Sequence, residues 1–338
     1  MQEYVIAALV ASAIAFFVVF GLVPPLIKNL TKKNWAVKDV NRVGGAMVPR
    51  PGGPAILAGI IAAEISLYFF LPQDRLIMRG ITALLITTSL AFVIGFVDDR
   101  RVMGGWFKPL SLAGAAIPII ALGAYEPNLS FPLFGEVKIP ALYIGLIIFM
   151  IPIMGNTINS IDVMNGIASG FMTITSFSLA IVLFILQNYS VAIMMLPIAF
   201  ASLAFYRYHK FPAKIFPGDS GALTLGAAYG VIAIVGQVEV IAAIALLPAI
   251  INSFLFLSSV KKIVEHRQIK GPTTHTDDHK ITTTKEPGAP VTLVRLIVAA
   301  KPLTEKEIGF AIFRLAIFSG VLAIITAFIS GVVIWPIS

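Results

Sequence analysis

The chain has 338 residues, of which 58% are hydrophobic and 12% are charged, and its mean hydropathy is +0.92. About a quarter of the residues of a soluble globular protein are charged, so the composition excludes that class and indicates an integral membrane protein. The chain contains no cysteine, which excludes disulfides and thiolate-bound metals.

Apolar runs long enough to cross a membrane recur along the chain and predict a single polytopic domain over residues 1–338. The first run is too long for the apolar region of a signal peptide and precedes a basic loop, so we expect a retained helix. The predicted spans are 4–27, 54–72, 79–97, 109–124, 140–158, 166–187, 189–207, 219–236, 238–260 and 307–335. The fold class expected is therefore an all-α membrane protein of about ten helices.

Lysine and arginine are divided unequally between the two sides that these spans define. The loops 28–53, 98–108, 159–165, 208–218 and 261–306 hold 20 of the 25. Cytoplasmic loops carry the excess of these residues, which predicts that these loops face the cytoplasm and that both termini lie outside the cell membrane. The net charge of +8 is then explained by topology and by attraction to anionic lipids or substrates, and not by nucleic-acid binding.

Two loops are predicted to have structure of their own. The outer loop 125–139 alternates weakly around proline and glycine, which predicts a short β-hairpin or an irregular loop. The cytoplasmic loop 261–306 ends in an apolar segment, 290–300, which is typical of a short amphipathic helix lying in the interface.

Asp98 and Asp99 end the third predicted helix. Adjacent helical residues point about 100° apart, so one acid could hold a metal while the other orients a nucleophile or a basic side chain. A solvated helix end is the simpler interpretation of the pair alone. Lys108 begins the next helix, where it could meet a lipid phosphate or only extend its amino group to the interface.

A polar stripe is predicted at the start of a helix, where polar residues recur at a spacing of three. Its members are Asn159, Asp162, Asn165 and Gly166, with Asn156 one turn earlier. Helix capping would explain one of them but not four. Amide and carboxylate oxygens suit Mg²⁺, which takes one or two protein groups together with waters and substrate phosphates.

Asp219 lies in the sequence Phe-Pro-Gly-Asp-Ser-Gly, directly before an apolar helix. The N-terminus of that helix offers N–H groups to an anion, and Asp219 could carry the metal that bridges to it. It could equally be a capping residue, and both roles can hold at once. His266 and Arg267 follow the ninth helix; arginine suits phosphate, although a basic run beside a membrane is usually an anchor.

All of these signatures lie on the predicted cytoplasmic side, which indicates one enzyme site acting on a charged substrate at the membrane surface. The rival function is an ion-coupled secondary transporter, in which the acids would lie near the bilayer midplane. The clustering at one face and the lack of a strong internal repeat argue against it.

Taken together, the motifs resemble the polyprenyl-phosphate N-acetylhexosamine-1-phosphate transferases. That family includes the bacterial phospho-MurNAc-pentapeptide translocase and the archaeal and eukaryotic UDP-GlcNAc–dolichyl-phosphate GlcNAc-1-phosphotransferases. The resemblance runs from about Asp39 to Arg314. It is carried by Asp39-Val40-Asn41-Arg42 leading to Pro51-Gly52-Gly53, by the Asp98-Asp99 pair, by the 159–166 stripe and by Phe216 to Asp219.

The resemblance implies a role for each candidate residue. Mg²⁺, or Mn²⁺ in its place, would be held by Asn159 and Asp219. Asp98 and Asp99 would be the catalytic acids, with Asp162, which matches the bacterial pattern, predicted to join them. Lys108 would bind the lipid phosphate. The nucleotide sugar would contact Asn165, Phe216, His266 and Arg267.

The reaction implied transfers GlcNAc-1-phosphate from UDP-GlcNAc to a polyprenyl or dolichyl phosphate and releases UMP, as the first step of a lipid-linked glycan pathway. Another UDP-N-acetylhexosamine, or undecaprenyl phosphate, would use the same motifs. His266-Arg267 resembles the archaeal and eukaryotic branch, although Glu265 stands where that branch usually has a basic residue. Expected partners are the two substrates and membrane lipids but no nucleic acid, with a homodimer left open.

Overall fold

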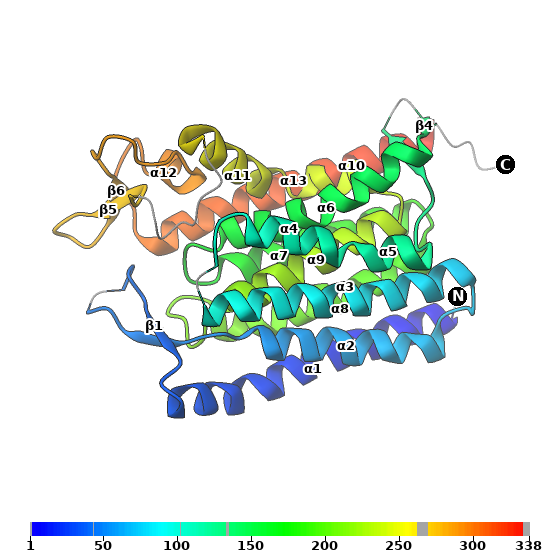
Figure 1. Ribbon diagram of the computed structural model, residues 1–338, viewed down its shortest axis with the longest axis horizontal. Helices are drawn as coiled ribbons and strands as arrows, with labels where there is room; N and C mark the ends of the chain where they lie inside the picture. Colours follow the sequence, from blue (N-terminus) through cyan, green and yellow to red (C-terminus); the bar gives the residue numbers. More distant parts are fainter. Residues whose placement is uncertain (1, 43, 102, 133–134, 262–269, 334–338) are drawn as a thin grey trace.

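The structure is a computed structural model that describes residues 2–42, 44–101, 103–132, 135–261 and 270–333. Within these residues it is a bundle of helices with three short hairpins (Figure 1). Eight helices are long and apolar enough to cross a membrane: α1 (Gln2–Lys32), α2 (Gly53–Phe70), α3 (Arg75–Arg100), α6 (Pro140–Ile161), α7 (Ile167–Ile185), α8 (Tyr189–His209), α9 (Gly218–Val235) and α13 (Glu305–Val333). The predicted all-α membrane fold is confirmed.

Two of the ten predicted spans are interrupted in the structure. The span predicted at 238–260 is a pair of helices, α10 (Glu239–Ala245) and α11 (Leu247–Val260), bent by 79°. The span predicted at 109–124 is formed by α4 (Phe107–Ala115) and α5 (Ile117–Leu122), which are shorter than the membrane-crossing helices. Pro118 in the first turn of α5 has no N–H for the carbonyl one turn earlier, so the helix breaks there. A count of ten is not confirmed.

The hairpin predicted in the loop 125–139 is confirmed. Strands β3 (Asn128–Phe131) and β4 (Gly135–Lys138) pair antiparallel. Two further hairpins were not predicted: β1 (Ala36–Lys38) with β2 (Met47–Pro49), and β5 (Thr273–His275) with β6 (Ile281–Thr283). Their strands have three residues each, too few for a readable alternation. The apolar segment 290–300 contains a single short helix, α12 (Leu293–Ile297), capped by Thr292.

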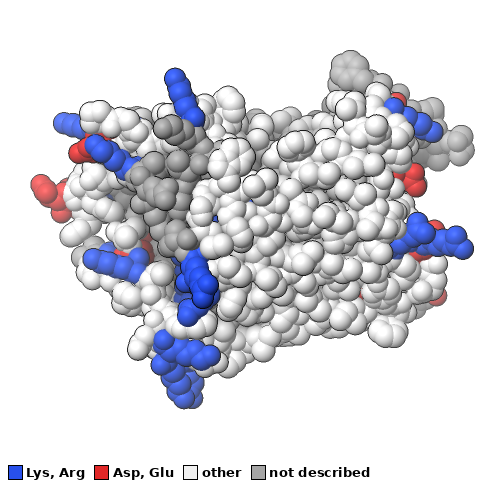
Figure 2. Space-filling view, in the orientation of Figure 1, with Lys and Arg blue, Asp and Glu red and all other residues white. Residues whose placement is uncertain are grey.

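Charged residues lie mainly at the two ends of the bundle. The hairpins β1–β2 and β5–β6 and helix α12 occupy one end, called the polar end below, whereas α1 begins at the opposite end, where β4 also lies (Figure 1). On the visible face, lysine and arginine gather at the polar end and the middle is almost uncharged (Figure 2). This is the arrangement expected of a bundle with an apolar belt in lipid.

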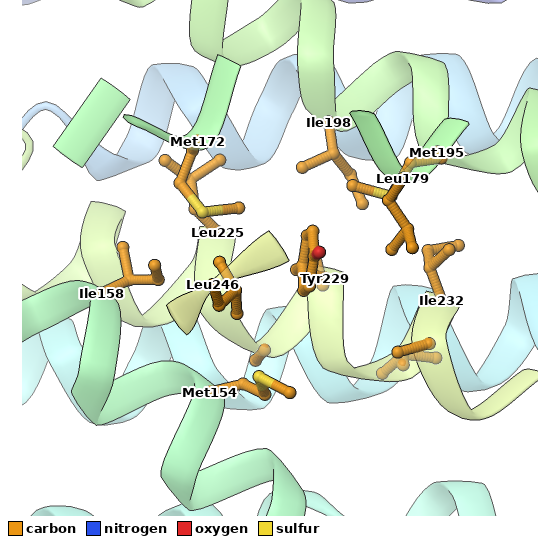
Figure 3. Packing of buried hydrophobic residues seen from close by; sticks show 14 of the residues in the cluster. Met154, Ile158, Met172, Leu179, Met195, Ile198, Leu225, Tyr229, Ile232 and Leu246 are labelled. Atoms are coloured by element: carbon orange, nitrogen blue, oxygen red, sulfur yellow. The ribbon is translucent and has the colours of Figure 1, made fainter. Parts of the chain in front are cut away.

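Helix α9 forms the centre of the bundle. Of its most apolar 18-residue window, 94% is buried, the largest share among the candidate spans of the described residues. Side chains from α6, α7 and α8 and from the break between α10 and α11 pack near it, among them Met154, Met172, Ile198 and Leu246 (Figure 3). The packing fixes α9 along its length, and its first turn, at the polar end, carries Asp219.

Candidate active site

A cavity of about 680 Å³ opens at the polar end. It is bordered by the residues after β1, by the turn between α6 and α7, by the start of α9 and by β5. Six of the predicted site residues line it: Lys108, Asn159, Asp162, Asn165, Phe216 and Asp219. Asp98 and Asp99 lie behind this wall, in contact with residues that line it. His266 and Arg267 lie outside the described residues, and their roles stay predictions.

Five charged side chains form a chain of ion pairs along one side of the cavity, called the charge array below. Asp219 lies at its centre: its Oδ1 accepts from Arg50 Nη2 at 2.7 Å, and its Oδ2 lies 2.5 Å from Lys108 Nζ. Lys108 Nζ also contacts Asp98 Oδ2 at 2.9 Å, and Arg50 Nη2 contacts Asp99 Oδ1 at 2.5 Å. No member is more than 18% exposed. Acids and bases therefore alternate, which offsets the cost of burying each charge.

Two glycines allow the array to assemble. At Gly95, α3 passes so close to α9 that an added Cβ atom would lie 2.5 Å from the Cα of Ser220. Gly218, which begins α9, has a φ of +71° and faces Asp99. Only glycine adopts this backbone conformation without strain. The ends of α3 and α9 are thereby joined, and their acids come together.

Asp99 holds the first turn of α9. Its carboxylate accepts from the backbone N–H of Asp219 at 2.9 Å and of Ser220 at 3.0 Å. These N–H groups would otherwise be unpaired at the start of a helix. Asp99 thus works as a cap supplied from a neighbouring helix, a contact that no sequence motif could indicate.

Arg50 is a site residue that the sequence reasoning missed. It lies between β2 and α2 and lines the cavity. Burial lowers the pKa of its guanidinium, but Asp99 and Asp219 more than compensate and raise that pKa above its usual value, so Arg50 is charged. The sequence does contain a signal for it: Arg50 stands between two prolines, just before Gly52 and Gly53. It lies within the segment from Asp39 to Gly53, of which only the first and last residues were taken as motifs.

The prediction of one polar stripe at the start of a helix is wrong. Helix α6 ends at Ile161, Asp162 follows it, and α7 begins only after Gly166, whose φ is +83°. Asn159 therefore lies in the last turn of α6, whereas Asp162 and Asn165 lie in the connecting turn. Side chains of this type compete with helical hydrogen bonds and favour such turns.

Asp162 and Asn165 each make structural contacts in this turn. Asp162 Oδ1 accepts from Ala168 N at 3.2 Å, and burial raises the pKa of Asp162 to about 7. The Asn165 amide donates to Asp39 Oδ2 at 3.1 Å and to Glu305 Oε1 at 2.6 Å. Both amide hydrogens of Asn165 are engaged in this way. Its predicted contact with the nucleotide stays a prediction.

The donor set fits a magnesium ion with few protein ligands. Asn159 and Asp219 both line the cavity and offer hard oxygen atoms. Within the described ranges no group of three His, Asp or Glu residues could hold a metal. An ion at Asp219 would therefore complete its shell with substrate phosphates and water.

Comparison with known proteins identifies the family. Residues 81–237 match the family described as glycosyl transferase family 4. A Saccharolobus solfataricus protein, named as a UDP-N-acetylglucosamine–dolichyl-phosphate N-acetylglucosaminephosphotransferase, is 28% identical over 75% of this chain and 79% of its own. A protein of Methanocaldococcus jannaschii named as a glycosyltransferase is 31% identical over 98% of this chain and 100% of its own. A Bacillus subtilis protein named as an undecaprenyl-phosphate N-acetylglucosaminyl 1-phosphate transferase is 27% identical over 70% of this chain and 65% of its own. The family inferred from the motifs is confirmed: this chain belongs to glycosyl transferase family 4.

Proposed function

We propose that this protein transfers N-acetylglucosamine-1-phosphate from UDP-N-acetylglucosamine to a polyprenyl phosphate of the dolichyl type, giving the lipid-diphosphate sugar and UMP. The observation that carries the proposal is the charge array, which brings three carboxylates and two cations to a cavity at the end of a membrane-spanning bundle. The names of the S. solfataricus and B. subtilis relatives, which specify a polyprenyl phosphate and N-acetylglucosamine, support the substrates.

The chemistry asks the protein mainly for positioning and for neutralisation of charge. An oxygen of the lipid phosphate attacks the phosphorus that bears the sugar, and the bond from that phosphorus to the UMP oxygen breaks. A phosphate monoester has its second pKa at about 6, so the attacking group is mostly dianionic at neutral pH and needs no strong base. Lys108 and Arg50 line the cavity in contact with Asp219, where they can neutralise phosphate charge.

Asn159 and Asp219 are the residues that would hold the expected divalent cation, Mg²⁺ or Mn²⁺. When bound, the ion supplies further neutralisation of the diphosphate. Lys108, which forms ion pairs with both Asp219 and Asp98, would bind the lipid phosphate in the cavity at the polar end. Asp98 orients Lys108, and Asp162, with its raised pKa, can hold a proton near neutral pH.

The position of the acids favours this reaction over ion-coupled transport. Asp98 and Asp99 are in the last turn of α3, and Asp219 is in the first turn of α9. A transporter would place them near the midplane. We infer that the polar end faces the cytoplasm, where UDP-sugars would be supplied, because the basic loops gather at that end.

The test is a direct assay in detergent. The purified protein is incubated with a polyprenyl phosphate and UDP-GlcNAc, with and without Mg²⁺, and UMP and a new lipid-linked sugar are measured. Release of UMP that requires both the lipid and Mg²⁺ supports the proposal. Release with another UDP-sugar alone would change the substrate. No release with any nucleotide sugar, from folded protein and suitable lipids, would refute the proposal.

A further inference from the structure

The carboxylate of Asp99 is turned toward Arg50 and the start of α9 and not toward the cavity. Its Oδ1 accepts from Arg50 Nε at 2.9 Å and Nη2 at 2.5 Å and from Asp219 N at 2.9 Å, while its Oδ2 accepts from Ser220 N at 3.0 Å. Three donors therefore contact Oδ1 and one contacts Oδ2, so four hydrogen bonds from Arg50 and α9 already hold this carboxylate. The side chain is 1% exposed, and Asp99 is not among the described residues that line the cavity.

Arg50, by contrast, reaches the cavity. Its Nε and Nη2 are bound to Asp99 and Asp219, and the hydrogen bonds found within the described residues leave its Nη1 group unused. A guanidinium held on one edge by carboxylates presents its other N–H groups in a fixed direction, which suits a phosphate oxygen. The ion pairs of Arg50 with both acids also offset the repulsion between Asp99 and Asp219.

We propose that Arg50 binds a phosphate group of the substrates through Nη1 and that Asp99 is a positioning residue. Asp99 acts by holding Arg50 and the first turn of α9, and not as a base that touches the substrate. This inference rests on the proposed function, because a phosphate must enter the cavity for Arg50 to bind it. The phosphate belongs either to the nucleotide or to the lipid, and the experiment separates these sources.

The first experiment is a double-mutant cycle on turnover. Arg50→Gln and Asp99→Asn should each lower kcat/KM by about a hundredfold, the scale of a misplaced reacting group. Because both changes remove the Arg50–Asp99 ion pair, the double variant should lose clearly less than the product of the two single losses. Arg50→Lys keeps the positive charge but not the planar set of N–H donors, so it should lose less kcat/KM than Arg50→Gln. Arg101→Gln, an exposed arginine just after α3, is the matched control and should behave as wild type.

The pH profile distinguishes positioning from base catalysis. If Asp99 only positions Arg50, the acidic limb of the kcat profile of Asp99→Asn has the wild-type shape at a lower level. If Asp99 is the base, that limb disappears in Asp99→Asn and remains in Arg50→Gln, which would overturn the proposal. Single-variant losses that multiply to about ten-thousandfold would overturn it as well.

A binding measurement keeps the inference independent of turnover. The affinity for UDP alone, and for a short-chain polyprenyl phosphate alone, is measured by calorimetry for folded wild-type, Arg50→Lys, Arg50→Gln and Arg101→Gln proteins. Weaker binding of one ligand by Arg50→Gln, with partial recovery in Arg50→Lys, supports the proposal and identifies which phosphate Arg50 holds. Unchanged affinity for both ligands overturns it. If wild type releases no UMP but shows this Arg50-dependent binding, the proposed function fails while the phosphate contact of Arg50 stands.

Discussion

The contact between α3 and α9 at Gly95 can be changed without altering any charged residue of the site. A Cβ atom there would lie 2.5 Å from Ser220 Cα and 2.6 Å from the carbonyl of Asp219, whereas ordinary contact begins at 3.4 Å. These atoms are backbone, so no side-chain rotation relieves the clash, and the helices must separate by about 0.9 Å. Gly95→Ala should lower the free energy of unfolding by about 1–3 kcal/mol.

The same separation displaces Asp219 from Asp99 and Arg50. An error of about 1 Å in a reacting group can cost about a hundredfold in rate, so Gly95→Ala should lower UMP release by that factor. The assay is UMP release with UDP-GlcNAc and polyprenyl phosphate, beside the thermal unfolding midpoint in detergent. Gly145→Ala in α6 is the matched control, because no heavy atom lies within 4 Å of its added Cβ. If the two variants match in both measurements, the argument that this contact positions Asp219 is refuted.

Three further predictions follow from the site. Asp219→Asn should abolish transfer in a protein that still unfolds cooperatively, because the centre of the charge array loses its charge; Mg²⁺-dependent turnover in this variant would contradict the assignment. Burial raises the pKa of Asp162 to about 7, so between about pH 4 and pH 7 the folded protein keeps a proton that the unfolded chain releases. Raising the pH through this window should therefore lower the unfolding midpoint, and Asp162→Asn should reduce that slope; an equal slope in both proteins would refute the buried-acid argument. Asn165→Ala should cost about 3 kcal/mol of stability by removing the side-chain amide that donates to two buried carboxylates, whereas Asn188→Ala, which removes no capping bond, should change the midpoint little.

The membrane helices could be predicted because an apolar run is a local signal. The span at 140–158 needed only its own residues, and the structure has α6 there. The break between α4 and α5 is also local, because it lies at Pro118, but the apolar run alone predicted one continuous span over 109–124. Proline inside a membrane helix can be tolerated when neighbours satisfy the freed carbonyl, and sequence does not say whether they do.

The site could be predicted only as a set of motifs and not as a set of contacts. Arg50 pairs with residues 49 and 169 positions away, and Asn165 bonds to Glu305, 140 positions away. Such separations leave no periodicity or spacing in the sequence. The motifs could therefore be found in the sequence. Which of their residues line the cavity, which cap a helix and which form ion pairs could be known only from the fold.

The burial of α9 has a consequence for how the protein is made. Of the eight candidate spans in the described residues, α9 has the lowest hydropathy, 1.4, although it is the most buried. A helix with so weak a preference for lipid depends on other helices to remain in the bilayer, and six candidate spans precede it in the chain. We therefore expect α9 to enter the membrane among helices that are already in place. Asp219 would then reach Arg50 and Asp99 after the six preceding spans, so the order of synthesis would contribute to completing the charge array.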